Sequence, residues 1–206
     1  MRTRWFLAAL VGVVLLLGRS DGIAQQQGAS GAQDAQGNED FSPADVARII
    51  KGFQIAPVPL NLHGKNLQLV GLGSYIVNAV GGCNDCHTSP PYAAGGDPFA
   101  GEPKKVNAAR YLAGGTPFGP PGDPNTPVSR NLTPRANGLP ANLTWEQFLL
   151  TIRTGADLKH RPPLAPSADN DLLQVMPWPV FQDMNTRDLR AIYEYLRSIP
   201  SLPSTP

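Results

Sequence analysis

The sequence predicts an all-α protein in which a few helices are separated by long, irregular loops. Three observations support this fold class. Several segments begin with a helix-capping residue and continue with apolar residues at helical spacing. No run of alternating apolar and polar residues is long enough to indicate a β-sheet, although a small hairpin within 92–118 is left open. The 206 residues include 22 prolines and 21 glycines, which interrupt regular structure between the helices. We expect one domain with extensions.

The first 24 residues are typical of a secretory signal peptide. Arg2 and Arg4 precede an almost wholly apolar run over 5–18, and residues 22–24 offer a small-residue cleavage site. The run is shorter than the ~20 residues that a membrane span needs, so we expect cleavage before Gln25 and a periplasmic protein. If the segment stays uncleaved, it would anchor the protein to the membrane.

The charge balance argues against a nucleic-acid partner. Removal of residues 1–24 takes away three arginines and one aspartate, which changes the net charge from +1 to about −1. Such a chain has no basic field to attract nucleic acid. Residues 25–40 consist mostly of Gln, Gly, Ala and acidic residues, with one Asn and no periodicity, and are predicted to be a disordered leader.

The first predicted helix begins after Ser42 and extends to about Ile50. Ser42 is its N-cap, Pro43 occupies the first helical position, and Asp45 is the acidic third residue. The prolines that follow predict an extended segment over 56–60.

A second helix is predicted over 66–79. Apolar residues recur there at helical spacing, at Leu69, Leu72, Ile76 and Val80. Gly71 and Gly73 each weaken an isolated helix by about 1 kcal/mol relative to alanine. We interpret Gly73, with its neighbour Tyr75, as a place where another helix approaches closely. The Gly81-Gly82 pair then ends the helix.

Two further helices are predicted after residues 88–142, which are mostly loop. The helix over 145–154 begins with the capping box of Thr144 and Gln147 and ends at Gly155. Residues 156–175 form another irregular loop. The last helix begins near Asn185, and Pro200 ends it. Its apolar stripe consists of Leu189, Ile192, Tyr193 and Leu196.

The two cysteines of the chain, Cys83 and Cys86, lie in a C-x-x-C-H motif that His87 completes. This motif is the attachment signal for a c-type haem. Thiols three residues apart on one helical turn can each add to a haem vinyl group, and the next residue can donate its imidazole to the iron. Attachment of this kind occurs outside the cytoplasm, in agreement with the signal peptide. We therefore expect one covalent haem c, around which the loops wrap.

Two other interpretations of the motif stay open. Cys83 and Cys86 could form a thioredoxin-like disulfide, but that site requires a βαβ pattern that the sequence lacks. A zinc site requires further ligands. His63 and His160 are far away in the sequence, and no second paired-ligand cluster accompanies them.

The second axial ligand of the iron decides the function. Met176 is the favoured candidate because Pro177 and Pro179 predict an extended, rigid segment that could hold a thioether on iron. Most methionines, however, only fill a core. The alternatives are Met184, His160, His63 and an open position.

A series of short segments carries a family resemblance. In order they are Gly73-x-Tyr75-Ile76, Gly82 to Thr88, Arg130-Asn131-Leu132-Thr133-Pro134, Thr144 to Phe148, Ile152 to Gly155, Met176-Pro177-Trp178 and Leu189 to Ser198. Over residues 67–200, this series resembles class I cytochromes c. The order of the segments is similar to that of one haem domain of the cytochrome c subunits of membrane-bound alcohol and aldehyde dehydrogenases.

The resemblance implies a cytochrome c fold with Met176 as the distal ligand. It also implies a crossing of the first and last helices, with Gly73 and Tyr75 on one side and Tyr193 and Leu196 on the other. Two features depart from the family. Those dehydrogenase subunits carry several haem motifs in one chain, and this chain has one. Residues 41–66 form an N-terminal extension without a counterpart, and 201–206 are a tail.

We expect an exported monohaem electron carrier rather than an enzyme, with haem held by Cys83 and Cys86 and iron bound by His87 and Met176. Its partners would be redox proteins, such as a dehydrogenase, an oxidase or another cytochrome. One alternative is a dedicated electron-transfer subunit of a periplasmic dehydrogenase or respiratory complex, with 41–66 as the docking segment. Another is a haem enzyme or gas sensor with an open distal site.

Overall fold

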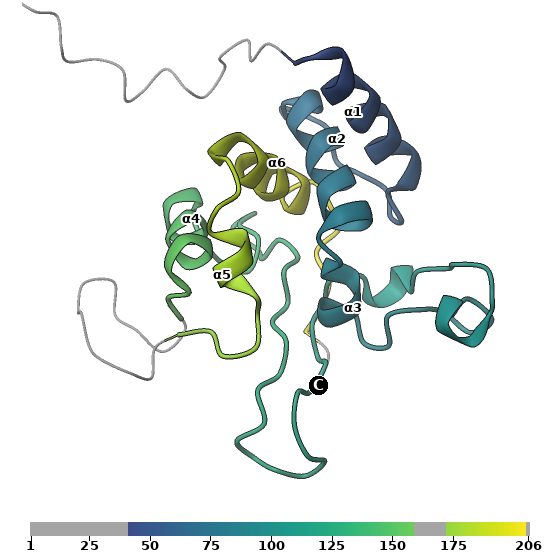
Figure 1. Cartoon of the computed structure of the whole chain (residues 1–206), viewed down its shortest axis with the longest axis vertical. Helices are drawn as coiled ribbons and strands as arrows, with labels where there is room; N and C mark the ends of the chain where they lie inside the picture. The colour runs from purple at the N-terminus through teal and green to yellow at the C-terminus, as the bar shows by residue number, and fades with distance from the viewer. Residues whose placement is uncertain (1–40, 159–171, 205–206) are drawn as a thin grey trace, which may run out of the picture. The chain divides into compact units, whose positions relative to one another are not determined.

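The computed structural model describes residues 41–158 and 172–204 (Figure 1). The predicted signal peptide, the predicted leader and His160 lie outside the described residues. Within them the chain is all-α, as predicted: β-bridges occur singly, as between Tyr92 and Val106, and build no strand. No helix in these two ranges has the length and apolar character that a membrane crossing requires.

The helices vary greatly in length. They are α1 (Pro43–Ile55), α2 (Leu67–Tyr75), α3 (Cys83–His87), α4 (Trp145–Thr154), α5 (Trp178–Phe181) and α6 (Thr186–Leu196). A π-helical turn, η1 (Ile76–Val80), continues α2 directly. Two 3₁₀ turns, η2 (Pro98–Ala100) and η3 (Ala108–Arg110), lie in the long loop after α3.

Helix α1 begins where the sequence predicts and ends later. The Ser42 side chain accepts a hydrogen bond from the Asp45 backbone N–H, and the Asp45 carboxylate accepts one from the Ser42 N–H, which completes a capping box. The helix passes the predicted end at Ile50 and continues to Ile55. Gly52 does not break it, because packing against α2 stabilises the turn that contains this glycine.

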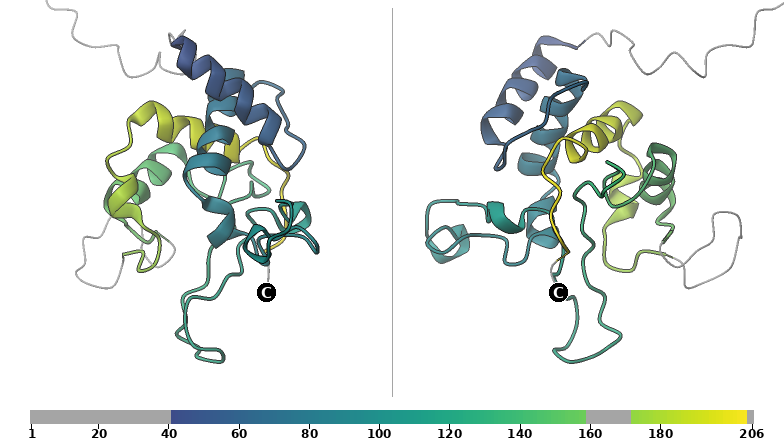
Figure 2. Two further views of the ribbon diagram at one scale, coloured as in Figure 1. Left: turned by 45° about the vertical axis from the view of Figure 1, so that its right-hand side comes forward. Right: turned by 180° about the vertical axis from the view of Figure 1, so that it is seen from behind.

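Helix α2 is packed between α1 and α6 (Figure 2). A Cβ atom on Gly52 would collide with the carbonyl oxygen of Gly71, so α1 and α2 meet backbone to backbone. A Cβ atom on Gly73 would collide with the carbonyl of Ala191 in α6. The prediction that Gly73 admits another helix is therefore confirmed. The extension over 41–66 places its helix on the opposite side of α2.

The second predicted helix is confirmed as α2 followed by η1. Asn66 caps it by accepting hydrogen bonds from the Gln68 and Leu69 N–H groups. Its last turn is π-helical, and the Gly81 N–H donates to the Ile76 carbonyl over 2.7 Å. Gly82, with φ of 61°, ends the segment as predicted. Val80 does not join the buried stripe: it is 66% exposed.

Helices α4 and α6 have the predicted caps. Thr144 and Gln147 form the capping box of α4, Gly155 ends it with φ of 72°, and Asn185 caps α6. The tyrosine that meets Gly73 at the helix crossing is Tyr195. Tyr193, which the family resemblance implied there, packs against α4. Its ring centroid lies 5.6 Å from Trp145 and 5.4 Å from Phe148.

The segment after Met176 differs from the extended segment predicted there. Trp178–Phe181 forms the one-turn helix α5, with Pro179 in its first turn, where a proline needs no N–H partner.

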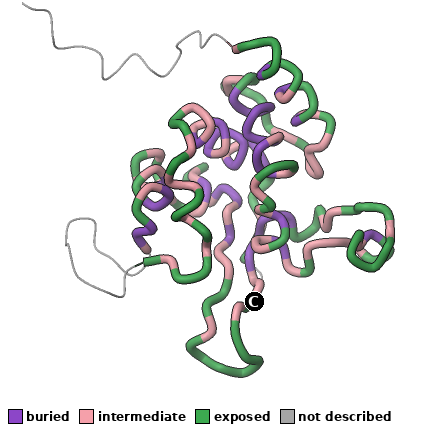
Figure 3. The backbone as a smooth tube through the Cα atoms, in the orientation of Figure 1, coloured by how far each residue is buried: buried purple, intermediate pink, exposed green. Residues whose placement is uncertain are grey.

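The main core joins α2, α4, α6 and the loop around Tyr111 (Figure 3). Its largest fully buried side chains include Tyr111, Tyr195, Leu112 and Leu189. We call the cluster of buried residues that contains them the main cluster. A smaller cluster, which includes Ile49, Leu72 and Ala191, lies between α1, α2 and α6.

Candidate haem-attachment site

The two cysteines occupy a single helical turn. Helix α3 consists of Cys83–His87, so both thiols and the imidazole lie within five consecutive residues. The thiols are free and not joined in a disulfide. Cys83 packs against the main cluster, and burial raises the pKa of its thiol to about 11. Burial, and then the charge of Asp85, also raise the pKa of Cys86. Both groups are therefore protonated thiols at neutral pH.

The ring of His87 is held in one tautomer. Its Nδ1 atom lies 2.7 Å from the backbone carbonyl oxygen of Arg130. Because a carbonyl can only accept, Nδ1 carries the proton and donates it. In a neutral imidazole, the lone pair then resides on Nε2. Burial lowers the pKa of His87, and the positive charge of Arg130 adds to this, against the opposing effect of the hydrogen bond. Nε2 is thus available as a metal ligand at neutral pH.

The backbone around Arg130 is held from two directions. The Arg130 guanidinium pairs with the carboxylate of Asp157. Gly114, with φ of 74°, lies against the same backbone. A Cβ atom there would come within 2.5 to 2.7 Å of backbone atoms of residues 129–131. Only glycine lets the two segments approach this closely, and the approach fixes the carbonyl that accepts from His87.

The residue after the motif is tied to the same loop. The buried Thr88 hydroxyl accepts a hydrogen bond from the Leu112 N–H over 2.9 Å, and the Leu112 carbonyl accepts from the Leu132 N–H over 2.8 Å. Leu112 has φ of 57°, which is uncommon outside glycine. Hydrogen bonds on both of its peptide groups hold it in this conformation.

The segment Arg130-Asn131-Leu132-Thr133-Pro134 also holds the C-terminal tail. The Asn131 side-chain amide donates to the Leu202 carbonyl over 2.9 Å, and the Leu202 N–H donates to the Thr133 hydroxyl over 3.1 Å. The Asn131 side-chain oxygen accepts in turn from the Thr133 hydroxyl over 2.7 Å. These bonds give the segment a structural role that its sequence did not disclose.

Met176 is half-buried and packs against the main cluster, the same cluster that Cys83 contacts. Its position is fixed by neighbours. The indole of Trp178 covers Gly155, where any Cβ atom would collide with it, and the indole N–H donates to the Leu173 carbonyl over 3.2 Å. The Leu173 N–H donates to the Gly155 carbonyl over 2.8 Å. Met176 therefore follows a segment pinned to the end of α4.

The other candidate ligands differ from Met176 in their surroundings. Met184 packs against both the main and the smaller cluster, which is the position of a core side chain. His63 is exposed in the turn after α1. His160 lies outside the described residues.

A buried polar network lies beside the attachment turn, and sequence reasoning did not find it. The Tyr111 hydroxyl donates to the Asn78 side-chain oxygen over 2.6 Å and lies 3.0 Å from the Tyr195 hydroxyl. The Asn78 amide donates to the Ser74 carbonyl over 2.9 Å. Burial raises the pKa of both tyrosines, so both phenols stay neutral. Asn78 lies at the centre of the π-turn η1, which no periodicity in the sequence indicated.

The donor set fits a c-type haem. Two thiols on one turn, an imidazole with a fixed Nε2 lone pair, and a thioether against the same apolar cluster are the groups that such a haem takes. Among the described residues, no three side chains of His, Cys, Asp or Glu gather into a metal-binding group.

Comparison with known proteins gives no further guidance. No family model, no curated protein and no solved structure matches this chain.

Proposed function

We propose that this protein is an exported c-type cytochrome that carries single electrons between redox proteins. The observation that carries the proposal is the hydrogen bond from His87 Nδ1 to the Arg130 carbonyl, within one turn of two free thiols. A bond of this kind orients a metal-bound histidine, and it raises the basicity of the ligating nitrogen. A C-x-x-C pair with only a structural role does not require an oriented imidazole beside it.

Each residue of the site has a distinct task. Cys83 and Cys86 would each form one thioether, and His87 would supply the proximal nitrogen through Nε2. Met176 would supply the distal sulfur, held by the contact of Trp178 with Gly155. When bound, haem supplies a single-electron Fe(III)/Fe(II) couple. The surrounding residues would limit the access of water and hold both ligands in the two oxidation states.

The proposed fold is that of class I cytochromes c. The contact of Gly73 with α6 supports it, because Gly73 lies in α2, the helix that leads through η1 to the attachment turn. If His87 and Met176 both bound the iron, no position would be left there for a substrate. Electrons would pass at a transient contact with a dehydrogenase, an oxidase or another cytochrome, and such contacts are small and weak.

The distal ligand can be tested by substitution. Replacement of Met176 by alanine removes the proposed sulfur ligand. We expect the oxidised Met176→Ala protein to lose the far-red methionine-to-iron absorption band, to bind carbon monoxide when reduced, and to have a lower reduction potential, while haem stays attached.

Met184→Ala is the matched control, because it removes a second partly buried methionine near the same core. We expect the control to keep the far-red band and to lose only stability. The reverse pattern would assign the distal position to Met184. If neither variant lost the band, neither methionine could be assigned as the iron ligand.

A further inference from the structure

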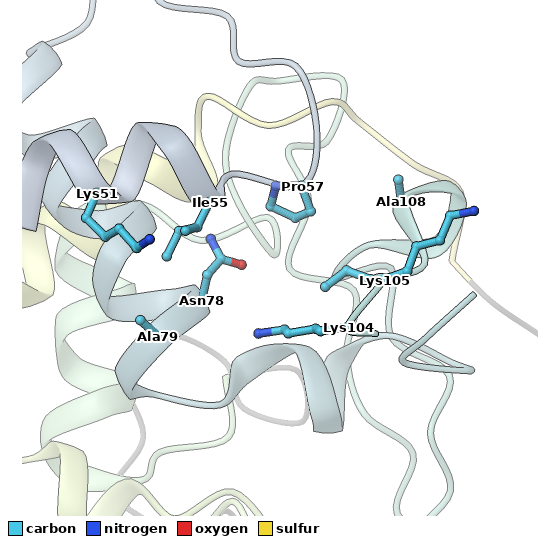
Figure 4. Close-up of a pocket in the computed structure, with 9 residues that line it drawn as sticks. Lys51, Ile55, Pro57, Asn78, Ala79, Lys104, Lys105 and Ala108 are labelled. Atoms are coloured by element: carbon cyan, nitrogen blue, oxygen red, sulfur yellow. The ribbon is translucent and has the colours of Figure 1, made fainter. Parts of the chain in front are cut away.

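A pocket of about 680 Å³ lies between α1, η1 and the loop that leads to η3 (Figure 4). Three lysines line it: Lys51 from α1, and Lys104 and Lys105 from the loop. Lys51 is far in the sequence from the consecutive Lys104 and Lys105, and the fold brings them together. Lys51 belongs to the N-terminal extension, so the extension supplies one wall of the pocket.

The charges in the pocket are uncompensated. None of the three lysines forms an ion pair with the part of the chain that the structure describes. No carboxylate lines the pocket. Figure 4 shows Lys51 and Lys104 reaching toward the pocket from opposite sides, with the Lys105 nitrogen further out near Ala108. The geometry therefore favours a ligand with negative charge and disfavours a cation.

The remaining lining is apolar and offers few hydrogen bonds. Ile55, Pro57, Ala79 and Val106 contribute carbon atoms. The polar side chain of Asn78 is already engaged with Ser74, Tyr111 and Tyr195. With few directional partners left, recognition would rest on the ammonium groups and on apolar contact. This combination suits a compact organic anion more than a sugar or a nucleobase.

Hydrogen bonds anchor the backbone on two sides of the pocket. On the side of α1, the Ser74 hydroxyl donates to the Gly52 carbonyl over 2.7 Å. On the loop side, the Lys105 N–H donates to the Gly96 carbonyl over 2.9 Å, and the Lys105 carbonyl accepts from the Ala93 N–H over 2.9 Å. Ligand sites are usually preformed concave pockets of about 300–1,000 Å³.

We propose that this pocket binds a small organic anion that carries at least two carboxylate or phosphate charges on a short apolar body. Lys51 and Lys104 neutralise the charges, and the apolar walls cover the body. The inference is independent of haem, since no residue of the attachment site lines the pocket.

The probe is isophthalate, an aromatic dicarboxylate, titrated into the full chain by calorimetry. Its neutral isostere isophthalamide is the ligand control. We expect saturable binding of isophthalate that weakens as the NaCl concentration rises, and no binding of isophthalamide. Each of the variants Lys51→Gln and Lys104→Gln should weaken binding about threefold, and the double variant about tenfold.

Lys65→Gln is the matched protein control, because it removes the same charge next to Arg197 and Glu194 rather than at the pocket. It should bind isophthalate as tightly as the native chain. Thermal unfolding of every variant checks that the fold is kept. Absence of binding, equal binding of isophthalamide, or unchanged affinity in the double variant would overturn the proposal. Binding of poly-glutamate without binding of isophthalate would overturn it in favour of an acidic protein partner.

Discussion

At the scale of single residues, the chemistry of the site depends on one proton. The Arg130 carbonyl fixes the proton of His87 on Nδ1, and burial keeps the ring neutral by lowering its pKa. The lone pair of Nε2 is therefore available without competition from protonation near pH 7. The same carbonyl depends on Gly114, because a side chain there would push the 129–131 backbone away.

Gly114→Ala tests this dependence. The substitution combines an unfavourable φ with a backbone collision, so we expect the free energy of unfolding to fall by about 2 kcal/mol or more. The reduction potential of the haem protein should shift as well, because His87 loses a well-placed acceptor. Chemical denaturation and potentiometric titration measure the two effects.

Gly122→Ala is the control for Gly114→Ala. Gly122 has φ of 83°, but a Cβ atom there would meet nothing within 4 Å. Gly122→Ala should lower the free energy of unfolding only by the cost of the left-handed conformation, about 1 kcal/mol. The reduction potential should stay unchanged. Equal effects of the two substitutions would mean that the approach of Gly114 to Arg130 has no part in holding His87.

At the scale of elements, the sequence predicted where helices begin better than where they end. The caps at Ser42, Thr144 and Asn185 are local signals, and all three are confirmed. The end of α1 was predicted too early, because Gly52 is stabilised by a contact with α2 that no local pattern discloses. The π-turn η1 and the short helix α5 were not predicted either.

The ion pair between α1 and α6 predicts that the stability of the fold depends on pH. Asp45 is buried, and its carboxylate lies 3.3 Å from the Arg187 guanidinium of α6 and also pairs with Arg48. The pKa of Asp45 is lowered, chiefly by the hydrogen bond from the Ser42 side chain. The Ser42 backbone N–H, Arg187 and Arg48 lower the pKa further, and together these effects outweigh the desolvation that raises it. Because the folded pKa lies below the unfolded value of about 3.9, the stabilisation is present at neutral pH and is lost as pH falls below about 4.

Asp45→Asn should therefore lower the free energy of unfolding at pH 7 and make it less sensitive to acid between about pH 5 and pH 2. Denaturation series at several pH values compare the variant with the native chain. Asp123→Asn, in an exposed loop, is the control and should leave the acid response unchanged. If the free energy of unfolding changed with pH in the same way in the native and the Asp45→Asn protein, the role given to Asp45 would be contradicted.

At the scale of the whole molecule, hydrogen bonds join segments that are distant in the sequence around the attachment turn. The Arg130 segment accepts from His87, pairs with Asp157 beyond α4 and holds Leu202 in the tail. The sequence predicts the two thiols and the imidazole as the site, because consecutive residues carry that motif. It could not identify the groups that hold them, since these meet only in the folded chain.

Mass spectrometry of the purified protein is the most direct test of the central claim. The protein is expressed in a host that attaches haem to C-x-x-C-H motifs and is measured after denaturation, so that only covalent groups remain. We expect the mature chain to be heavier by one haem, and the Cys83→Ala/Cys86→Ala double variant to have the mass of the polypeptide alone. A native chain with only the mass of its polypeptide would contradict the account.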